Sequence, residues 1–178
     1  MMDKTKTGLL LLLLDHFKEI KGRTRIQKML YLTNQIGWNA IKDYHFYQYG
    51  PYSEWLKREL DILVQQGLIE EKQENISDEK TLYEYKITPD GSKYLQTINL
   101  QPSDLVTKTK NFLDQLKNYR TDDLEIMTSL YFLRKSDPEI DTDERLVKFI
   151  ELYKPWYDSK KIEKNLEVFK LMEPLIKN

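Results

Sequence analysis

Cysteine is absent from the 178-residue chain. Disulfides, thiolate nucleophiles and cysteine-ligated zinc are therefore excluded, and the composition fits a reducing cytosol. Only two histidines occur, His16 and His45, and neither has sequence neighbours that suggest a metal site or a nucleophile–base pair. A glycine-rich phosphate loop is also missing from the sequence. We therefore expect no catalytic residues, no metal and no cofactor.

One acidic run, residues 141–144, has the composition of a cation site. It stands where a helix is predicted to begin. Acids at such a position are better explained as capping groups and as a complement to the positive end of the helix dipole.

An excess of positive charge is missing as well. The chain has 28 Lys and Arg residues against 29 Asp and Glu residues, for a formal net charge of −1. Nucleic-acid-binding domains usually carry a basic excess, so the overall charge gives that function no support. A hydrophobic content of 40% and an aromatic content of 12% instead indicate a globular protein of one domain, or of two small ones.

Long hydrophobic runs are limited to the six leucines at 9–14, which follow Lys4 and Lys6. Asp15 ends this run, which is far shorter than the roughly 20 apolar residues of a membrane span. No small-residue cleavage site follows it, as a signal peptide would require. The run predicts a buried first helix, and we expect a cytoplasmic protein without a membrane partner.

Residues 44–69 are the stretch around which the chain is organised. Alternation predicts a strand at 44–49, with Tyr44 and Phe46 on one face. A Gly-Pro turn at 50–51 leads to a helix at 53–66, capped by Ser53 and ended by Gly67 in a left-handed conformation.

The rest of the N-terminal half completes a winged helix-turn-helix pattern. Thr24 is predicted to cap the second helix, and Pro-Asp-Gly at 89–91 predicts a turn. The remaining elements are predicted helices at 8–20, 25–36 and 92–98, strands at 68–73 and 82–88, and a polar loop at 74–80.

Four further helices follow a connector at 99–103. They are predicted at 104–118, 122–135, 142–153 and 159–173. The predicted fold class is mainly α with a small β-hairpin (α+β). It comprises a winged helix-turn-helix domain at 1–98 and a four-helix C-terminal subdomain at 104–178 packed on it.

Two motifs resemble a known family. Residues 22–32, Gly-Arg-Thr-Arg-Ile-Gln-Lys-Met-Leu-Tyr-Leu, are similar to the basic helix of the YwgA-like winged-helix proteins and of the related Panacea (SocA-like) antitoxin domain. The second signature of these families is matched by Tyr-Gly-Pro-Tyr-Ser at 49–53, followed by Glu-Leu at 59–60 and Gly-Leu-Ile at 67–69. The helical tail, with Lys-Pro-Trp at 154–156, also resembles theirs, although less sharply.

The resemblance implies a non-enzymatic protein. Panacea-type domains neutralise a toxin by binding it, and many of their winged-helix relatives regulate transcription. The resemblance does not decide between these two functions.

A DNA-binding winged helix usually places its third helix, here 53–66, in the major groove, and its wing, here residues 70–80, on the phosphate backbone. The charge pattern of this chain is unfavourable for that arrangement. The helix at 53–66 carries Lys57 and Arg58 against three acids, and residues 70–80 carry two lysines against five acids. Acids in these positions repel the phosphate backbone.

Residues 20–42 have the opposite character, with five basic residues and no acid. This stretch suits a phosphate, an acidic partner surface or the carboxyl terminus of another chain. It also fits a solvated helix face whose arginines pair with Asp15, Glu19 or the acidic wing, so both interpretations stay open.

A dense aromatic cluster adjoins this stretch. Tyrosine and tryptophan are enriched in binding hot spots, yet a strand and turn packed under the C-terminal helices is the favoured explanation for most of the cluster. We expect Tyr47, Tyr49 and Tyr52 to be partly exposed. The cluster comprises Tyr44, Phe46, Tyr47, Tyr49, Tyr52 and Trp55.

Two functional hypotheses follow. The first is a non-catalytic, antitoxin-type regulatory protein that binds a toxin-like protein partner. The second is a DNA-binding transcriptional regulator whose phosphate contacts come from the basic second helix, with a homodimer through the C-terminal helices left open. The candidate partner- or DNA-binding residues are Lys21, Arg23, Arg25, Lys28, Tyr47, Tyr49, Tyr52, Lys57 and Arg58.

Overall fold

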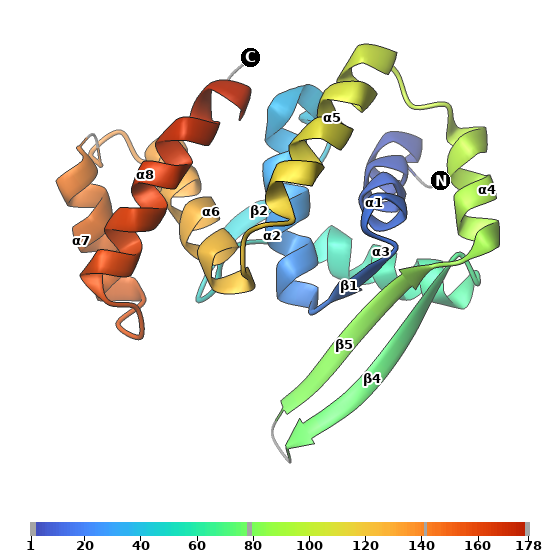
Figure 1. The fold of residues 1–178 in the computed structure, drawn as a ribbon, viewed down its shortest axis with the longest axis horizontal. Coiled ribbons are helices and arrows are strands. Elements are labelled where there is room, and N and C mark those ends of the chain that lie inside the picture. The colour runs from blue at the N-terminus through green and yellow to red at the C-terminus, as the bar shows by residue number, and fades with distance from the viewer. Residues whose placement is uncertain (1–2, 78–79, 141, 177–178) are drawn as a thin grey trace.

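The computed structural model describes residues 3–77, 80–140 and 142–176 and shows a mixed α+β fold (Figure 1). The helices are α1 (Lys4–Phe17), α2 (Arg23–Thr33), the π-helical η1 (Asn34–Trp38), α3 (Glu54–Gln65), α4 (Pro89–Ile98), α5 (Ser103–Leu116), α6 (Thr121–Ser136), α7 (Asp143–Tyr153) and α8 (Ser159–Ile176). The strands are β1 (Glu19–Lys21), β2 (Tyr44–Tyr47), β3 (Gly50–Ser53), β4 (Ile69–Ser77) and β5 (Lys80–Ile87). They form two antiparallel sheets, of order β1-β5-β4 and β2-β3.

Helix α1 is the buried first helix that the leucine run predicts. All six leucines at 9–14 are at most 4% exposed, because α1 packs against α4, α5 and the β1–β5 part of the sheet. Over the described ranges, no helix combines the length and apolar character needed to cross a membrane.

The predicted end of this helix at residue 20 is wrong. The helix stops at Phe17, and Lys18 takes a positive φ of 63°. The next three residues form β1, which pairs with β5 and brings Glu19 opposite Lys86 at 2.9 Å. Pairing with a strand more than 60 residues away decides this segment, not its local helix propensity.

Helix α2 begins earlier than predicted, at Arg23. Its N-cap is Gly22, with a φ of 94°, so Thr24 lies inside the helix and does not cap it. Gly37 has a φ of 131° within η1, and Asn39, in a left-handed conformation, follows as the C-cap.

Helix α3 follows the prediction closely. Ser53 accepts a hydrogen bond from the Leu56 amide at 3.3 Å, and Gly67 has a φ of 68° just beyond the helix. The predicted turn at 89–91 is wrong, however. Pro89 begins α4, where Thr88 accepts from the Gly91 amide at 3.0 Å.

The hairpin β4–β5 is longer than predicted and projects from the helical body (Figure 1). Most of the predicted loop at 74–80 lies within its strands, where Glu74 pairs with Leu82 and Asn75 with Thr81. The pairing of β4 with β5 starts at the core end of the hairpin and continues through polar residues of low strand propensity. Residues 78 and 79 lie outside the described ranges.

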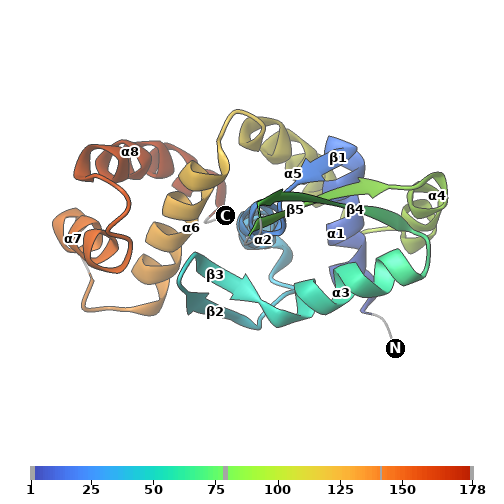
Figure 2. The ribbon, with the colours of Figure 1, turned by 90° about the horizontal axis from the view of Figure 1, so that it is seen from below.

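The four C-terminal helices are confirmed, with boundaries within three residues of those predicted. Helix α6 packs against α2, α7, α8 and β3, and Figure 2 shows it beside the β2–β3 hairpin. One buried cluster of apolar side chains runs from α1 through α6 to α8.

Candidate functional site

The β2–β3 hairpin presents aromatic rings on both of its faces. Tyr44 and Phe46 lie on one face, as predicted, and that face is turned inward: the Phe46 ring centroid lies 5.6 Å from that of Phe132 on α6. Tyr47 and Tyr49 are each 52% exposed, and Tyr52 is partly buried, which confirms the predicted exposure.

The hairpin turn lies at Gln48 and Tyr49, not at Gly50-Pro51 as predicted, and β3 itself was not predicted. Gly50 begins β3 with a φ of 85°. A Cβ atom there would lie 2.4 Å from the Ser129 hydroxyl oxygen of α6. Glycine is therefore required for close approach to α6 and for the backbone angle, and the turn itself falls two residues earlier.

Helix α2 fixes the other end of the hairpin through Gln27. Its side-chain amide donates to the Ser53 carbonyl at 2.9 Å and accepts from the Ser53 amide at 3.0 Å. Asp43 accepts from the Ser53 hydroxyl at 2.7 Å and from the Trp55 amide at 3.0 Å. The start of α3 and the end of β3 are thus fixed to one point on α2.

Two buried lysines donate hydrogen bonds to backbone carbonyls of the hairpin. The Lys28 ammonium donates to the Pro51 carbonyl at 2.7 Å and is 1% exposed. Lys154, which is completely buried, donates to the Gln48 carbonyl and to the Glu125 carboxylate, both at 2.7 Å. Burial lowers the pKa of Lys154, against the effect of Glu125, and lowers the pKa of Lys28 to about 7.

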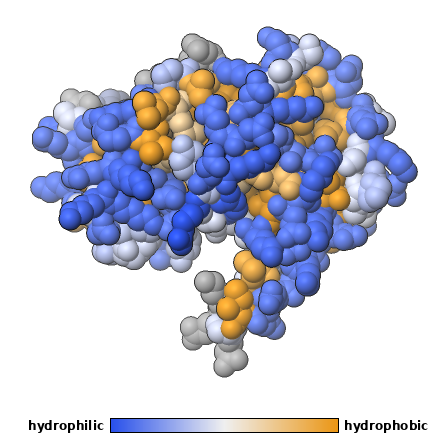
Figure 3. All heavy atoms as spheres, viewed as in Figure 1, coloured by the Kyte–Doolittle hydropathy of each residue, from blue (hydrophilic) through white to orange (hydrophobic). Residues whose placement is uncertain are grey.

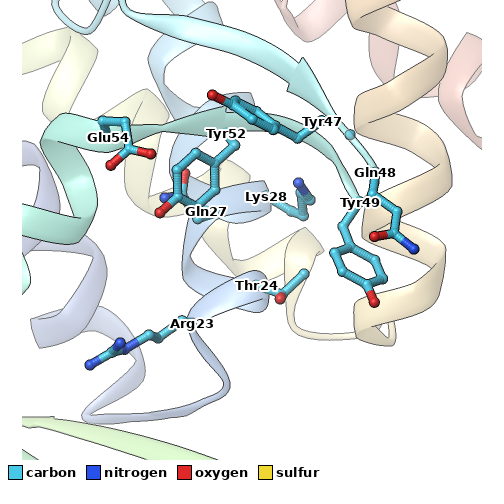
Figure 4. A pocket seen from close by; sticks show the side chains of 10 residues that line it. Arg23, Thr24, Gln27, Lys28, Tyr47, Gln48, Tyr49, Tyr52 and Glu54 are labelled. Carbon is cyan, nitrogen blue, oxygen red and sulfur yellow. The ribbon is translucent and has the colours of Figure 1, made fainter.

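A cavity of about 360 Å³ opens between α2 and this hairpin. Figure 4 shows tyrosine rings of the hairpin on one side and the first turns of α2 on the other. It is lined by Arg23, Thr24, Gln27, Lys28, Tyr47, Gln48, Tyr49, Gly50, Tyr52 and Glu54. Five of the nine predicted site residues thus meet here: Arg23, Lys28, Tyr47, Tyr49 and Tyr52.

The role predicted for Lys28 needs correction. Its side chain is buried under the hairpin and cannot reach a phosphate on a DNA surface. Helical periodicity alone did not show this, because burial of Lys28 depends on the hairpin that covers it.

Arg23 pairs with an acidic residue of β4, as the interpretation of the basic stretch as a solvated surface anticipated. It donates to Glu71 at 2.8 Å, makes a hydrogen bond to the Tyr85 hydroxyl, and lies 3.9 Å from the centroid of the Tyr83 ring. Burial opposes the charge of Arg23, but the hydrogen bonds to Glu71 and Tyr85 outweigh it and raise its pKa. The guanidinium thus connects α2 to the β4–β5 hairpin.

The other four predicted residues do not line the cavity. Lys21 pairs with Glu84 at 3.3 Å, and Arg25 donates to the Tyr119 carbonyl at 2.7 Å. Lys57 and Arg58 are exposed on α3.

Sequence reasoning missed the residues that support the site, chiefly Gln27, Glu125 and Lys154. Gln27 lies in the 22–32 motif and Lys154 in the helical tail that resembles the family less sharply, and this resemblance was the only signal available for them. Glu125 stands among consecutive buried positions of α6, where no polar face distinguishes it.

In the part of the chain that the structure describes, no group of three or more His, Asp or Glu side chains is arranged to hold a metal ion. His16 pairs with Asp114 at 3.0 Å. In the acidic run 141–144, Thr142 caps α7, and Asp143 and Glu144 lie in its first turn, as the capping interpretation predicts. Asp141 lies outside the described residues.

Comparison with known proteins gives one informative relative, and no protein-family model matches the chain. The relative is the uncharacterized protein YwgA of Bacillus subtilis (strain 168), which is 32% identical over 122 residues. The match covers 68% of this chain and 70% of the relative. The chain therefore belongs to the YwgA family.

Proposed function

We propose that this protein is a non-catalytic, antitoxin-type regulator that binds a protein partner through the β2–β3 hairpin and the cavity beside it. In this proposal residues 1–98 form a winged helix, with α3 as its third helix and β4–β5 as its wing. The relation to the Panacea antitoxin domain belongs to the same proposal. The proposal also includes a separate C-terminal subdomain at 104–178 and a cytoplasmic location.

The observation that carries the proposal is the half-exposed pair Tyr47 and Tyr49, which lies on a hairpin whose backbone accepts hydrogen bonds from two buried lysines. Aromatic side chains on a preorganised backbone lose little entropy on binding and are frequent interface anchors. Lys28 of α2 fixes β3 and Lys154, just after α7, fixes the turn. The two rings are therefore held in place before a partner binds.

Charge also favours a protein partner over DNA. Arg23 is engaged by Glu71, and Lys28 is buried, so two of the six basic candidate residues are engaged within the protein itself. The β4 strand, which a winged helix brings close to the DNA backbone, exposes Glu70 and Glu74.

The test is capture of the tagged protein with its partners from native lysate, with and without nuclease. We expect a stoichiometric protein that survives nuclease and is lost with the double variant Tyr47→Ser/Tyr49→Ser. Ile76→Ser is the control, since Ile76 is 55% exposed on β4, in a different hairpin. Expression of the captured protein alone should arrest growth, and co-expression of the wild-type chain, but not of the tyrosine variant, should restore it.

DNA binding is the second candidate, favoured by the exposure of Lys57 and Arg58 on α3. It predicts recovery of a defined DNA fragment that nuclease removes, with binding that weakens steeply with salt. Replacing Lys57 or Arg58 by Ala should then lower the salt slope by about one. Recovery of DNA, with no protein partner after nuclease treatment, would overturn the first proposal.

A homodimer through the C-terminal helices is a further proposal. Figure 3 shows apolar atoms over this part of the face, as well as over other parts of it. Exposed apolar side chains there include Leu152 and Tyr153 on α7 and Leu171 on α8. Leu171→Ser should therefore weaken such a dimer, and sedimentation measures the change.

A further inference from the structure

The buried charges beneath the hairpin do not balance. Lys28 and Lys154 are both buried, and Glu125 accepts from Lys154. For Lys28 the structure shows one acceptor, the neutral Pro51 carbonyl, although an ammonium has three donors. Beneath the hairpin, the described residues thus place two buried lysines beside one buried carboxylate, that of Glu125. A buried charge without a counterion is costly.

The cavity beside Lys28 has room for a ligand that supplies a negative charge. Lys28 lines the cavity, and Figure 4 shows its side chain extending from α2 toward the hairpin, between Tyr49 and Tyr52. The volume of about 360 Å³ lies within the range of small-ligand sites. The Thr24 hydroxyl and the tyrosine rings add a polar group and apolar walls.

We propose that this cavity binds a carboxylate attached to an apolar or aromatic group, with the Lys28 ammonium as its counterion and the rings of Tyr47, Tyr49 and Tyr52 around the apolar part. The carboxylate belongs either to a free organic acid or to the carboxyl terminus of a protein chain. The second source rests on the proposed protein partner. The first does not.

A singly charged carboxylate fits the site better than a phosphate does. One uncompensated ammonium neutralises one charge. The Arg23 guanidinium is engaged by Glu71, and Glu54 lines the cavity with a charge that repels a dianion. Phosphate sites usually combine several cationic or backbone donors.

The charge of Lys28 couples binding to protons. Burial lowers its pKa, Glu125 opposes this shift and Lys154 adds to it, so that the pKa of Lys28 is lowered to about 7. The other charged or titratable groups around the cavity are Arg23, Glu54 and the three tyrosines. A carboxylate stabilises the protonated amine, so binding takes up a proton and weakens as pH rises above 7, by up to about tenfold per unit.

Titration calorimetry on the full chain tests this inference with four probes. Benzoate represents a free acid, and N-acetyl-phenylalanine represents a chain terminus. Benzamide and N-acetyl-phenylalaninamide are their neutral counterparts. We expect at least one acid to bind about tenfold or more tightly than its amide, with proton uptake measured in buffers of different ionisation enthalpy. Binding of benzoate would identify a free acid as the source, whereas binding of N-acetyl-phenylalanine alone would identify a chain terminus.

Two variants locate the site. Lys28→Met should abolish acid binding, and circular dichroism checks that it folds. Tyr49→Ser, at an exposed turn position, should weaken binding several-fold without affecting the fold. Lys93→Met, a lysine on α4 that does not line the cavity, is the matched control and should bind as wild type does.

Equal affinity for acid and amide, unchanged binding by a folded Lys28→Met variant, or no saturable binding of either acid at millimolar concentration would overturn the inference. The capture experiment does not require an anion in the cavity. The two proposals therefore fail separately.

Discussion

Lys154 makes two buried contacts across long sequence distances. Its ammonium reaches the Gln48 carbonyl, 106 residues away, and the Glu125 carboxylate, both at 2.7 Å. The lysine is completely buried and the Glu125 side chain is 6% exposed. Such a pair adds little net stability when intact, but its parts are costly when separated.

Lys154→Met should therefore lower the free energy of unfolding by about 3 to 5 kcal/mol, since it leaves Glu125 buried without a cation. Urea denaturation measures the loss. Lys28→Met is the matched control, because it removes a buried lysine whose direct acceptor is a neutral carbonyl, and it should cost about 1 kcal/mol or less. Equal losses for the two variants would mean that Glu125 is not left as an unpaired charge.

The β2–β3 hairpin depends, as an element, on the contact between Gly50 and α6. Gly50 and Gly67 both have positive φ, at 85° and 68°. They differ in their surroundings. A Cβ at Gly50 would lie 2.4 Å from the Ser129 hydroxyl oxygen, whereas a Cβ at Gly67 would have nothing within 4 Å.

This pair gives a controlled substitution. Gly67→Ala should cost about 1 to 2 kcal/mol, the price of a left-handed residue alone. Gly50→Ala should cost about 1 to 3 kcal/mol more, because α6 must also move. The double variant Gly50→Ala/Ser129→Ala should recover part of that excess in a double-mutant cycle. Equal costs at Gly50 and Gly67 would show that α6 does not constrain the hairpin.

At the scale of the whole molecule, the described residues form a continuous apolar cluster. It includes Met29 and Tyr31 of α2, Leu130 of α6 and Phe169 of α8. Trp38 also donates to the Thr109 hydroxyl on α5 at 2.8 Å. The two proposed domains therefore share a core, and the inner surface of α2 is covered by C-terminal helices.

A shared core predicts cooperative unfolding. Denaturation followed by circular dichroism at 222 nm and by tryptophan fluorescence should give coincident transitions. A fragment of residues 1–98 should not unfold cooperatively, because it leaves the α2 surface uncovered. Two separate transitions, or a stable fragment, would show that the halves fold independently.

The amino-acid sequence determined the features that rest on local patterns. Side-chain periodicity and capping residues predicted the helices, and Ser53 and Gly67 occupy their predicted roles at the ends of α3. Alternation within 44–49 predicted which tyrosines are exposed. These signals act within a few residues, so they survive in the folded chain.

Tertiary structure decided the rest. Strand β1 forms because β5 lies beside it, and β4 extends through a polar segment because β5 continues to pair with it. Lys28 is buried because the hairpin covers it, and the Lys154–Glu125 pair joins elements 29 residues apart. Hydrogen bonds and desolvation between distant segments leave no periodic trace in a single sequence. The cavity and its unbalanced charge therefore appear only when the chain is folded.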